Sequence, residues 1–133
     1  MKIGICFGGY CPMHQGHLDV IMRAKKENDI CFVIVCGYDN EPRGEEVGLP
    51  LRRRVTLVRK MFKDDEQIKV LEINDTELGL DESCSEDNWK IWLNKSLDLI
   101  DDYLWDNNIF TDENIIQIFD QKFATTSFEK TFK

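Results

Sequence analysis

Two histidines, the only two in the chain, lie three residues apart in a glycine-rich segment near the N-terminus. The segment, residues 8–17, reads GGYCPMHQGH. The imidazoles of His14 and His17 can donate hydrogen bonds to phosphate oxygens from one side of a turn. Gly8 and Gly9 allow the backbone to approach a phosphate closely and to take a positive φ where the turn needs one. The residue types and their spacing therefore predict a phosphate site.

Two other interpretations of the histidine pair stay open at this point. The pair can be two surface residues of a tight turn without a chemical role. It can also ligate a metal, but no third ligand follows at a useful spacing. We therefore expect no protein-bound metal.

The elements on either side of this segment place it for anion binding. Residues 2–7 form a short apolar run typical of a buried strand, and residues 16–27 carry apolar side chains at helical spacing. The helix beginning near Gly16 would direct its free N–H groups and the positive end of its dipole toward the same space.

The rest of the chain continues this alternation. We expect strands at 30–36, 68–73 and 109–110, and helices at 50–62, 88–104 and 112–123, the last capped by Thr111 or Asp112. Buried strands alternating with helices predict an α/β fold, a small doubly wound parallel sheet. In such a sheet, ligands bind at the carboxyl ends of the strands, where the winding reverses.

Length and charge narrow the class of protein. A chain of 133 residues with 42% hydrophobic residues suits one domain over 1–133, with a core of about 1–123 and a tail over 124–133. The net charge of −8 argues against nucleic acid and anionic membranes as partners. No apolar stretch approaches membrane-spanning length, and the five cysteines contain no C-x-x-C pair. We expect a reduced, cytoplasmic protein.

The pattern Gly8-x-x-x-Pro12-x-His14-x-Gly16-His17, after a strand and before a helix, resembles the signature of the nucleotidyltransferase superfamily. Its register is most similar to nicotinamide mononucleotide adenylyltransferases of the NadR and NadM types, over about residues 2–113. The chain departs from that pattern with Gly9 at a basic position and Tyr10 in place of Phe. The resemblance implies a Rossmann-like nucleotidyltransferase fold.

The resemblance also implies a reaction. The 5′-phosphate of nicotinamide mononucleotide would attack the α-phosphorus of ATP, giving NAD and pyrophosphate, with Mg²⁺ accompanying the ATP. His14 and His17 would hold the ATP phosphates and stabilise the transition state. The residues expected to line the nucleotide site with them are Gly8, Gly9, Tyr10, Gly16 and Gly37. Relatives in the superfamily are often multimeric, and the sequence leaves open whether this chain forms a homo-oligomer.

Three arginines at positions 52–54 begin a predicted helix, where the helix dipole disfavours positive charge. Arg52 and Arg54 flank the apolar stripe of that helix and fall on the Pro-x-Arg-x-Arg pattern of the NadR type. We expect Arg54, and with it Arg52, to contact substrate or phosphate. Arg53 points away from the stripe and is expected to be solvated.

The predicted helix over 88–104 carries a second resemblance. NadM-type enzymes show Asn-x-x-x-Trp here, with the Trp stacked on the nicotinamide ring, and Asn88 and Trp92 match that pattern. Trp89 is a further candidate for substrate binding. The alternative for both tryptophans is the core. Asp39 and Asn40, which follow the second strand, are either turn residues or lie near a ribose or metal.

One part of the family pattern is missing. Relatives carry Ser-x-Thr-x-x-Arg at the start of a helix after the last strand. The nearest string here, residues 125–130, follows the predicted helix over 112–123 without an intervening strand. We therefore expect a fold that lacks the last strand and helix. Two alternatives follow: a truncated, weakly active nucleotide-binding domain, or a cytidylyltransferase-like enzyme acting on another phosphate acceptor.

Overall fold

The computed structural model describes residues 1–38, 46–79, 86–111, 113–119 and 125–130, and within these it describes the side chains of all but 86–89 and 125–129. Five strands form one sheet in the order β3-β2-β1-β4-β5. The elements are β1 (Lys2–Gly8), α1 (Gln15–Glu27), β2 (Ile30–Gly37), α3 (Leu51–Met61), β3 (Ile68–Asn74), α4 (Glu86–Asp106), β4 (Asn114–Phe119) and β5 (Thr125–Lys130).

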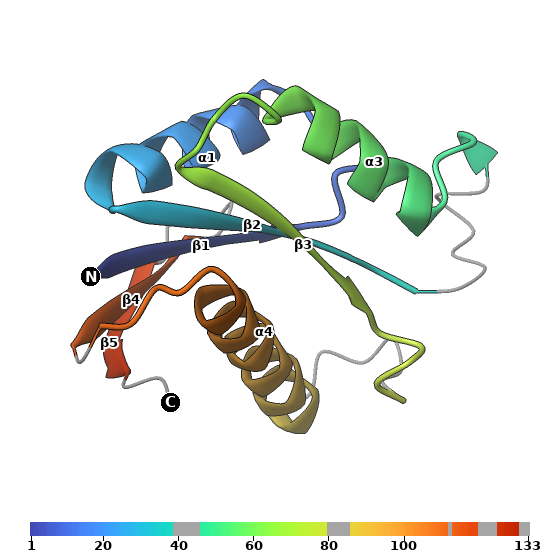
Figure 1. Cartoon of the computed structure of the whole chain (residues 1–133). Coiled ribbons are helices and arrows are strands. Elements are labelled where there is room, and N and C mark those ends of the chain that lie inside the picture. Colours follow the sequence, from blue (N-terminus) through green and yellow to red (C-terminus); the bar gives the residue numbers. More distant parts are fainter. Residues whose placement is uncertain (39–45, 80–85, 112, 120–124, 131–133) are drawn as a thin grey trace.

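Helices cover both faces of the sheet, as Figure 1 shows, with α1 and α3 on one face and α4 on the other. Strands β1 to β4 run parallel, so the predicted α/β class with a doubly wound parallel sheet is confirmed. The predicted elements over 2–7, 16–27, 30–36, 50–62, 68–73 and 88–104 are all present, with small shifts at their ends.

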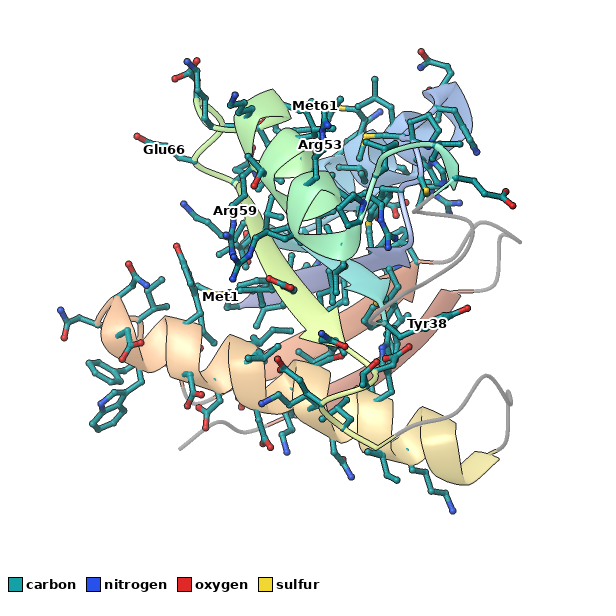
Figure 2. The ribbon with its side chains drawn as sticks, turned by 90° about the vertical axis from the view of Figure 1, so that its right-hand side faces the viewer. Met1, Tyr38, Arg53, Arg59, Met61 and Glu66 are labelled. Atoms are coloured by element: carbon teal, nitrogen blue, oxygen red, sulfur yellow. The ribbon has the colours of Figure 1, made fainter. Side chains whose placement is uncertain are left out.

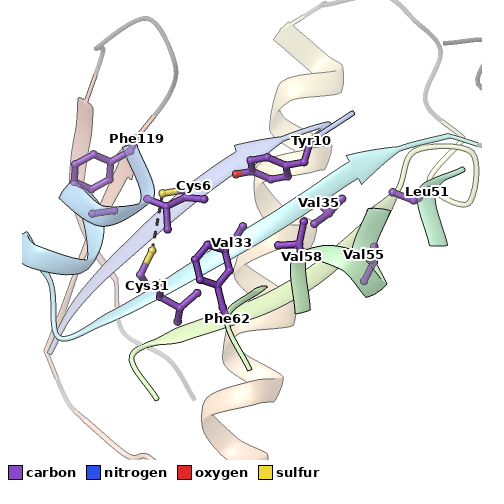
Figure 3. Close-up of a cluster of buried hydrophobic side chains, with 13 residues drawn as sticks. Cys6, Tyr10, Cys31, Val33, Val35, Leu51, Val55, Val58, Phe62 and Phe119 are labelled. Atoms are coloured by element: carbon purple, nitrogen blue, oxygen red, sulfur yellow. Dashed lines mark hydrogen bonds between the residues drawn. The ribbon is translucent and has the colours of Figure 1, made fainter. Parts of the chain in front are cut away.

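Side chains of the central strands alternate between two cores. Cys6, Val33 and Val35 belong to the core under α1 and α3, which Figure 3 shows. Ile5 and Phe32 belong to the core against α4. Because both faces are covered, β1 and β2 read in the sequence as continuous apolar runs.

The end of the chain differs from the prediction. The helix predicted over 112–123 and the strand predicted at 109–110 are both wrong, because residues 114–119 form strand β4 beside β1. Ile116 is fully buried and Ile118 nearly so, whereas Ile115 is 41% exposed, which is the period of a strand. A short apolar run fits both periods, and pairing with β1 decides between them. Thr111 therefore precedes a strand instead of capping a helix, and Asp112 lies outside the described residues.

The predicted tail and the predicted loss of the last strand are also corrected. Residues 125–130 form β5, which pairs antiparallel with β4 at the edge of the sheet. An antiparallel hairpin therefore takes the place of a further crossover. The string over 125–130 lies in a strand, so it does not open a helix as the second phosphate motif of the family does.

None of the helices in the described ranges combines the length and the apolar character needed to cross a bilayer.

Candidate active site

The histidine segment lies at the carboxyl end of β1, the strand at which the winding reverses. β2 pairs with one edge of β1 and β4 with the other. Residues 9–14 connect β1 to α1, so the N-terminus of α1 faces the space above this switch point. Such a position is where doubly wound sheets bind ligands.

His14 and His17 hold each other in place at the start of α1. The backbone N–H of His14 donates to Nδ1 of His17 at 3.0 Å, and the backbone N–H of His17 donates to Nδ1 of His14 at 3.4 Å. Together they form a capping box with His14 as the N-cap. The two rings stack with centroids 3.6 Å apart.

This arrangement fixes the tautomer of both rings. Since each Nδ1 accepts a backbone N–H, each neutral imidazole carries its proton on Nε2. The pair therefore presents N–H donors at the positive end of a helix dipole. His14 is exposed, whereas His17 is 8% exposed.

The conformation of Tyr10 explains why position 8 is a glycine. Its backbone has φ of 48°, so the positive φ falls on Tyr10 and not on Gly8 or Gly9. A Cβ at Gly8 would meet the Tyr10 ring at 2.9 Å, and a Cβ at Gly16 would meet the His14 ring at 3.0 Å. Both glycines are thus required by an aromatic ring of the same segment.

The Tyr10 ring is buried beside the carboxyl end of β1 (Figure 3) and touches His17 edge-on, with centroids 5.0 Å apart. Burial raises the pKa of its phenol above the ordinary value, so the ring stays neutral next to the histidines. The contact with His17 was not foreseen from the sequence, because no local pattern signals a buried tyrosine with positive φ.

Arg54 joins the histidine segment to two other parts of the chain. Its Nη1 donates to the carbonyl of Gly9 at 2.7 Å and to that of Cys36 at 3.3 Å, and its Nε donates to the carbonyl of Leu49 at 2.9 Å. The side chain is 1% exposed. The structure thus brings Arg54 to the site but buries it, while its contact with a substrate stays a prediction.

Arg52 and Arg53, the other two arginines at the start of α3, are exposed, and Figure 2 shows Arg53 on this helix. Arg52 makes no contact with the histidine segment among the interactions described, and its role stays a prediction. Gly37 is buried at the end of β2, where its carbonyl accepts the backbone N–H of Asp75 at 2.8 Å.

Trp92 of α4 lies on the other face of the sheet, where its ring packs on Phe7 with centroids 3.8 Å apart. Phe7 directly precedes the glycine pair, so the indole is close to the switch point and half-buried in the core against α4. Burial raises the pKa of the Cys36 thiol, while a hydrogen bond from the Trp92 side chain acts to lower it. The contact between Phe7 and Trp92 was not predicted from the sequence, since an apolar strand residue gives no functional signal.

Four predicted positions have side chains outside the described part of the chain. Asn88 and Trp89 fall in the first turns of α4, and their side chains are outside the described part, as are Asp39 and Asn40 altogether. Within the described residues, no group of three His, Cys, Asp or Glu side chains is arranged to hold a metal ion.

A parallel sheet with donor side chains and a helix N-terminus at its switch point is typical of α/β nucleotide-binding proteins. The comparison with known families is more specific. The chain belongs to the cytidylyltransferase-like family, whose model matches residues 5–126.

Two curated relatives match over 70 residues, about half of this chain. A phosphopantetheine adenylyltransferase from Fusobacterium nucleatum is 38% identical, and a probable nicotinate-nucleotide adenylyltransferase from Nitratiruptor sp. is 31% identical. The match spans 53% of this chain and 40% of each relative.

Two solved structures of NadR protein have the same fold. One, in complex with NAD and AMP-PNP, superposes with a TM-score of 0.68 at 32% identity. The other, in complex with NR, gives a TM-score of 0.71 at 34% identity. Both cover 88% of this chain, which spans 30% of the first NadR chain and 29% of the second. The resemblance to a NadR-like nucleotidyltransferase is thus confirmed at the level of family and fold.

Proposed function

We propose that this protein is an adenylyltransferase that joins ATP and nicotinamide mononucleotide to give NAD and pyrophosphate. The observation that carries the proposal is the reciprocally bonded pair His14 and His17 at the N-terminus of α1. The adenylyltransferase names of both curated relatives support adenylyl transfer. The NadR complex with NAD and AMP-PNP supports nucleotides as ligands.

The reaction requires little covalent chemistry from the protein, because the acceptor attacks ATP directly. A phosphate oxygen of the acceptor attacks the α-phosphorus of ATP, the bond from that phosphorus to the bridging oxygen breaks, and pyrophosphate leaves with the electron pair. His14 and His17 donate from Nε2 to the phosphate oxygens, where negative charge must be neutralised. The N–H groups and dipole of α1 act on the same oxygens. Mg²⁺ bound to the ATP substrate would neutralise further phosphate charge.

The acceptor is the least constrained part of the proposal. The half-buried indole of Trp92, beside Phe7 at the switch point, is a flat ring that favours an aromatic base such as nicotinamide. Phosphopantetheine is a second candidate because the relative named for it is 38% identical over 70 residues. A cytidylyltransferase-like activity toward glycerol 3-phosphate is the third.

A panel of substrates tests these candidates. ATP or CTP with Mg²⁺ is paired with nicotinamide mononucleotide, nicotinate mononucleotide, phosphopantetheine or glycerol 3-phosphate, and both pyrophosphate and product are measured. We expect NAD from ATP and nicotinamide mononucleotide at the highest kcat/KM. A higher kcat/KM for another pair would replace the acceptor or the base.

Calorimetric titration with MgATP in parallel separates the remaining alternative. Binding of ATP without product from any pair would identify a nucleotide-binding domain of little activity. The His17→Ala variant is the matched control, and we expect it to lose product formation.

A further inference from the structure

Arg54 matches a sequence pattern that predicts contact with phosphate, but its guanidinium is buried inside the protein. It is 1% exposed, and it lies on the buried side of α3 with Leu51, Val55 and Val58. A ligand at the surface of the site has no open path to a side chain so enclosed. The described hydrogen bonds of Arg54 instead run to backbone carbonyls of the protein.

Those contacts come from three separate segments that meet at the switch point. Gly9 belongs to the histidine segment, Cys36 to the carboxyl end of strand β2, and Leu49 to the residues before α3. A planar guanidinium with several donors in a fixed geometry can bond three carbonyls at once, which the point charge of a lysine does less well. The shortest of the three bonds, at 2.7 Å, is the one to Gly9.

The bond to Gly9 bears directly on the histidines. The carbonyl of Gly9 belongs to the peptide that enters Tyr10, whose φ of 48° is rarely adopted by a side-chain-bearing residue. With Gly9 held, the ring of Tyr10 packs over Gly8 and against His17 at 5.0 Å. The orientation of the Gly9 peptide thus determines where Tyr10 lies, and the Tyr10 ring in turn packs against that of His17.

We propose that Arg54 is a positioning residue that acts on the catalytic pair through the Gly9 carbonyl and the Tyr10 ring, without touching the substrate. The kinetic part of this inference rests on the proposed adenylyl transfer. The structural part does not, because the orientation of the histidines can be measured in the free protein.

The chain is well suited to such a measurement since it has two histidines. A long-range ¹H–¹⁵N correlation spectrum of the full chain shows two imidazole patterns, each of which reports its tautomer. The variants are Arg54→Met, which removes the donors, and Arg54→Lys, which keeps the charge. Arg53→Met, at the exposed neighbour on the same helix, is the matched control.

With Arg54→Met we expect the imidazole pattern of His17 to report that the ring no longer holds only the Nε2–H tautomer. We also expect kcat to fall by about 10², the cost of misplacing a catalytic group by roughly 1 Å, with little change in KM for ATP. Arg54→Lys should stay impaired, because charge alone does not hold the carbonyls. Arg53→Met should match the wild type in both measurements.

Two results would overturn the proposal. One is a wild-type imidazole spectrum in Arg54→Met together with a raised KM for ATP, which would mean direct contact with the nucleotide. The other is full recovery of kcat in Arg54→Lys. If Arg54→Met does not fold by circular dichroism, Tyr10→Leu decides, since the inference requires that this change alone shifts the His17 pattern.

The absence of NAD formation by the wild type would count against the proposed function only. The two imidazole patterns of the variants would still decide whether Arg54 positions the histidines.

Discussion

The side chain of His14 has two tasks that depend on different ring atoms. Its Nδ1 accepts the backbone N–H of His17 and caps α1, while its Nε2 carries the proton available to a phosphate. Stability and activity can therefore be separated by one choice of substitution.

We predict that His14→Ala loses both properties and that His14→Asn loses only one. Alanine removes the cap, which costs about 0.5–2 kcal/mol of the free energy of unfolding, whereas asparagine is itself a favoured N-cap. Both variants lack the imidazole donor, so kcat should fall by roughly 10²–10³ in each. Urea unfolding and steady-state kinetics measure the two effects. Equal stability of the two variants would show that the His14 ring does not cap the helix.

Gly8 offers a second prediction at this scale. A Cβ there would lie 2.9 Å from the Tyr10 ring, so Gly8→Ala must displace a buried aromatic. Overpacking of this kind costs typically about 1–3 kcal/mol, which urea unfolding would reveal. Gly9→Ala is the control, because its Cβ would meet its nearest neighbour at an ordinary 3.5 Å. Equal losses in the two variants would contradict the packing described for Tyr10.

At the scale of elements, an ion pair ties α1 to the turn that leads into β3. Lys25 Nζ lies 2.6 Å from Asp65 Oδ2, and the backbone N–H of Gln67 donates to Asp65 Oδ1 at 3.0 Å. The hydrogen bond from Lys25 is the largest cause of a lowered pKa for Asp65. A carboxyl with a lowered pKa in the fold stabilises the fold at higher pH and loses that contribution as pH falls.

We predict that Asp65→Asn lowers the free energy of unfolding at pH 7 by about 0.2–1 kcal/mol, the range for partly exposed pairs. The difference from wild type should shrink as the pH falls through 3.8, the ordinary pKa of an aspartate, and below it. Urea unfolding across this range, in a double-mutant cycle with Lys25→Met, measures the coupling. Lys26→Met serves as the control, and a difference that does not depend on pH would contradict the assignment.

The elements also show what a single sequence can predict. Strands β1 and β2 are runs of mostly buried residues that each end at a glycine, and α3 has a clear apolar stripe after Pro50, so local patterns were sufficient. The pattern over 114–119 fits a helix as well as a strand, and its state depends on pairing with β1, 113 positions away at Lys2 and Ile115.

The histidine pair was predictable for the same local reason, because its partners lie within three residues of each other. The contacts of Arg54 were not, since its acceptors are backbone carbonyls brought together by the fold. A helical wheel places Arg54 beside the apolar stripe and cannot show whether its charge turns toward solvent or toward the backbone.

At the scale of the whole molecule, two cysteine thiols and one tyrosine phenol are buried in their protonated form. The neighbouring Cys31 thiol and burial raise the pKa of Cys6, and burial raises those of Cys36 and Tyr10. The Cys6 and Cys31 sulfurs lie 3.9 Å apart under α1, as Figure 3 shows. The unfolded chain would ionise these groups near their ordinary values, 9.0 for a thiol and 10.0 for tyrosine.

Above about pH 9 the unfolded state therefore binds fewer protons than the folded state, so stability must fall as pH rises. We predict a decline of up to about 1.4 kcal/mol per pH unit for each such group, measured by urea unfolding between pH 7 and 10.5. The double variant Cys6→Ala, Cys36→Ala should give a shallower slope. An identical slope in wild type and double variant would show that these thiols do not contribute.

The pairing of β1 with β4 has a consequence for how the chain is made. Lys2 aligns with Ile115, so β1 pairs with a strand that is translated more than a hundred residues later. While a ribosome translates the intervening residues, the central strand β1 has one edge without a paired strand. The sheet can close on this side only after β4 has been synthesised, and until then the unpaired edge of β1 is where a nascent chain would be vulnerable to mispairing.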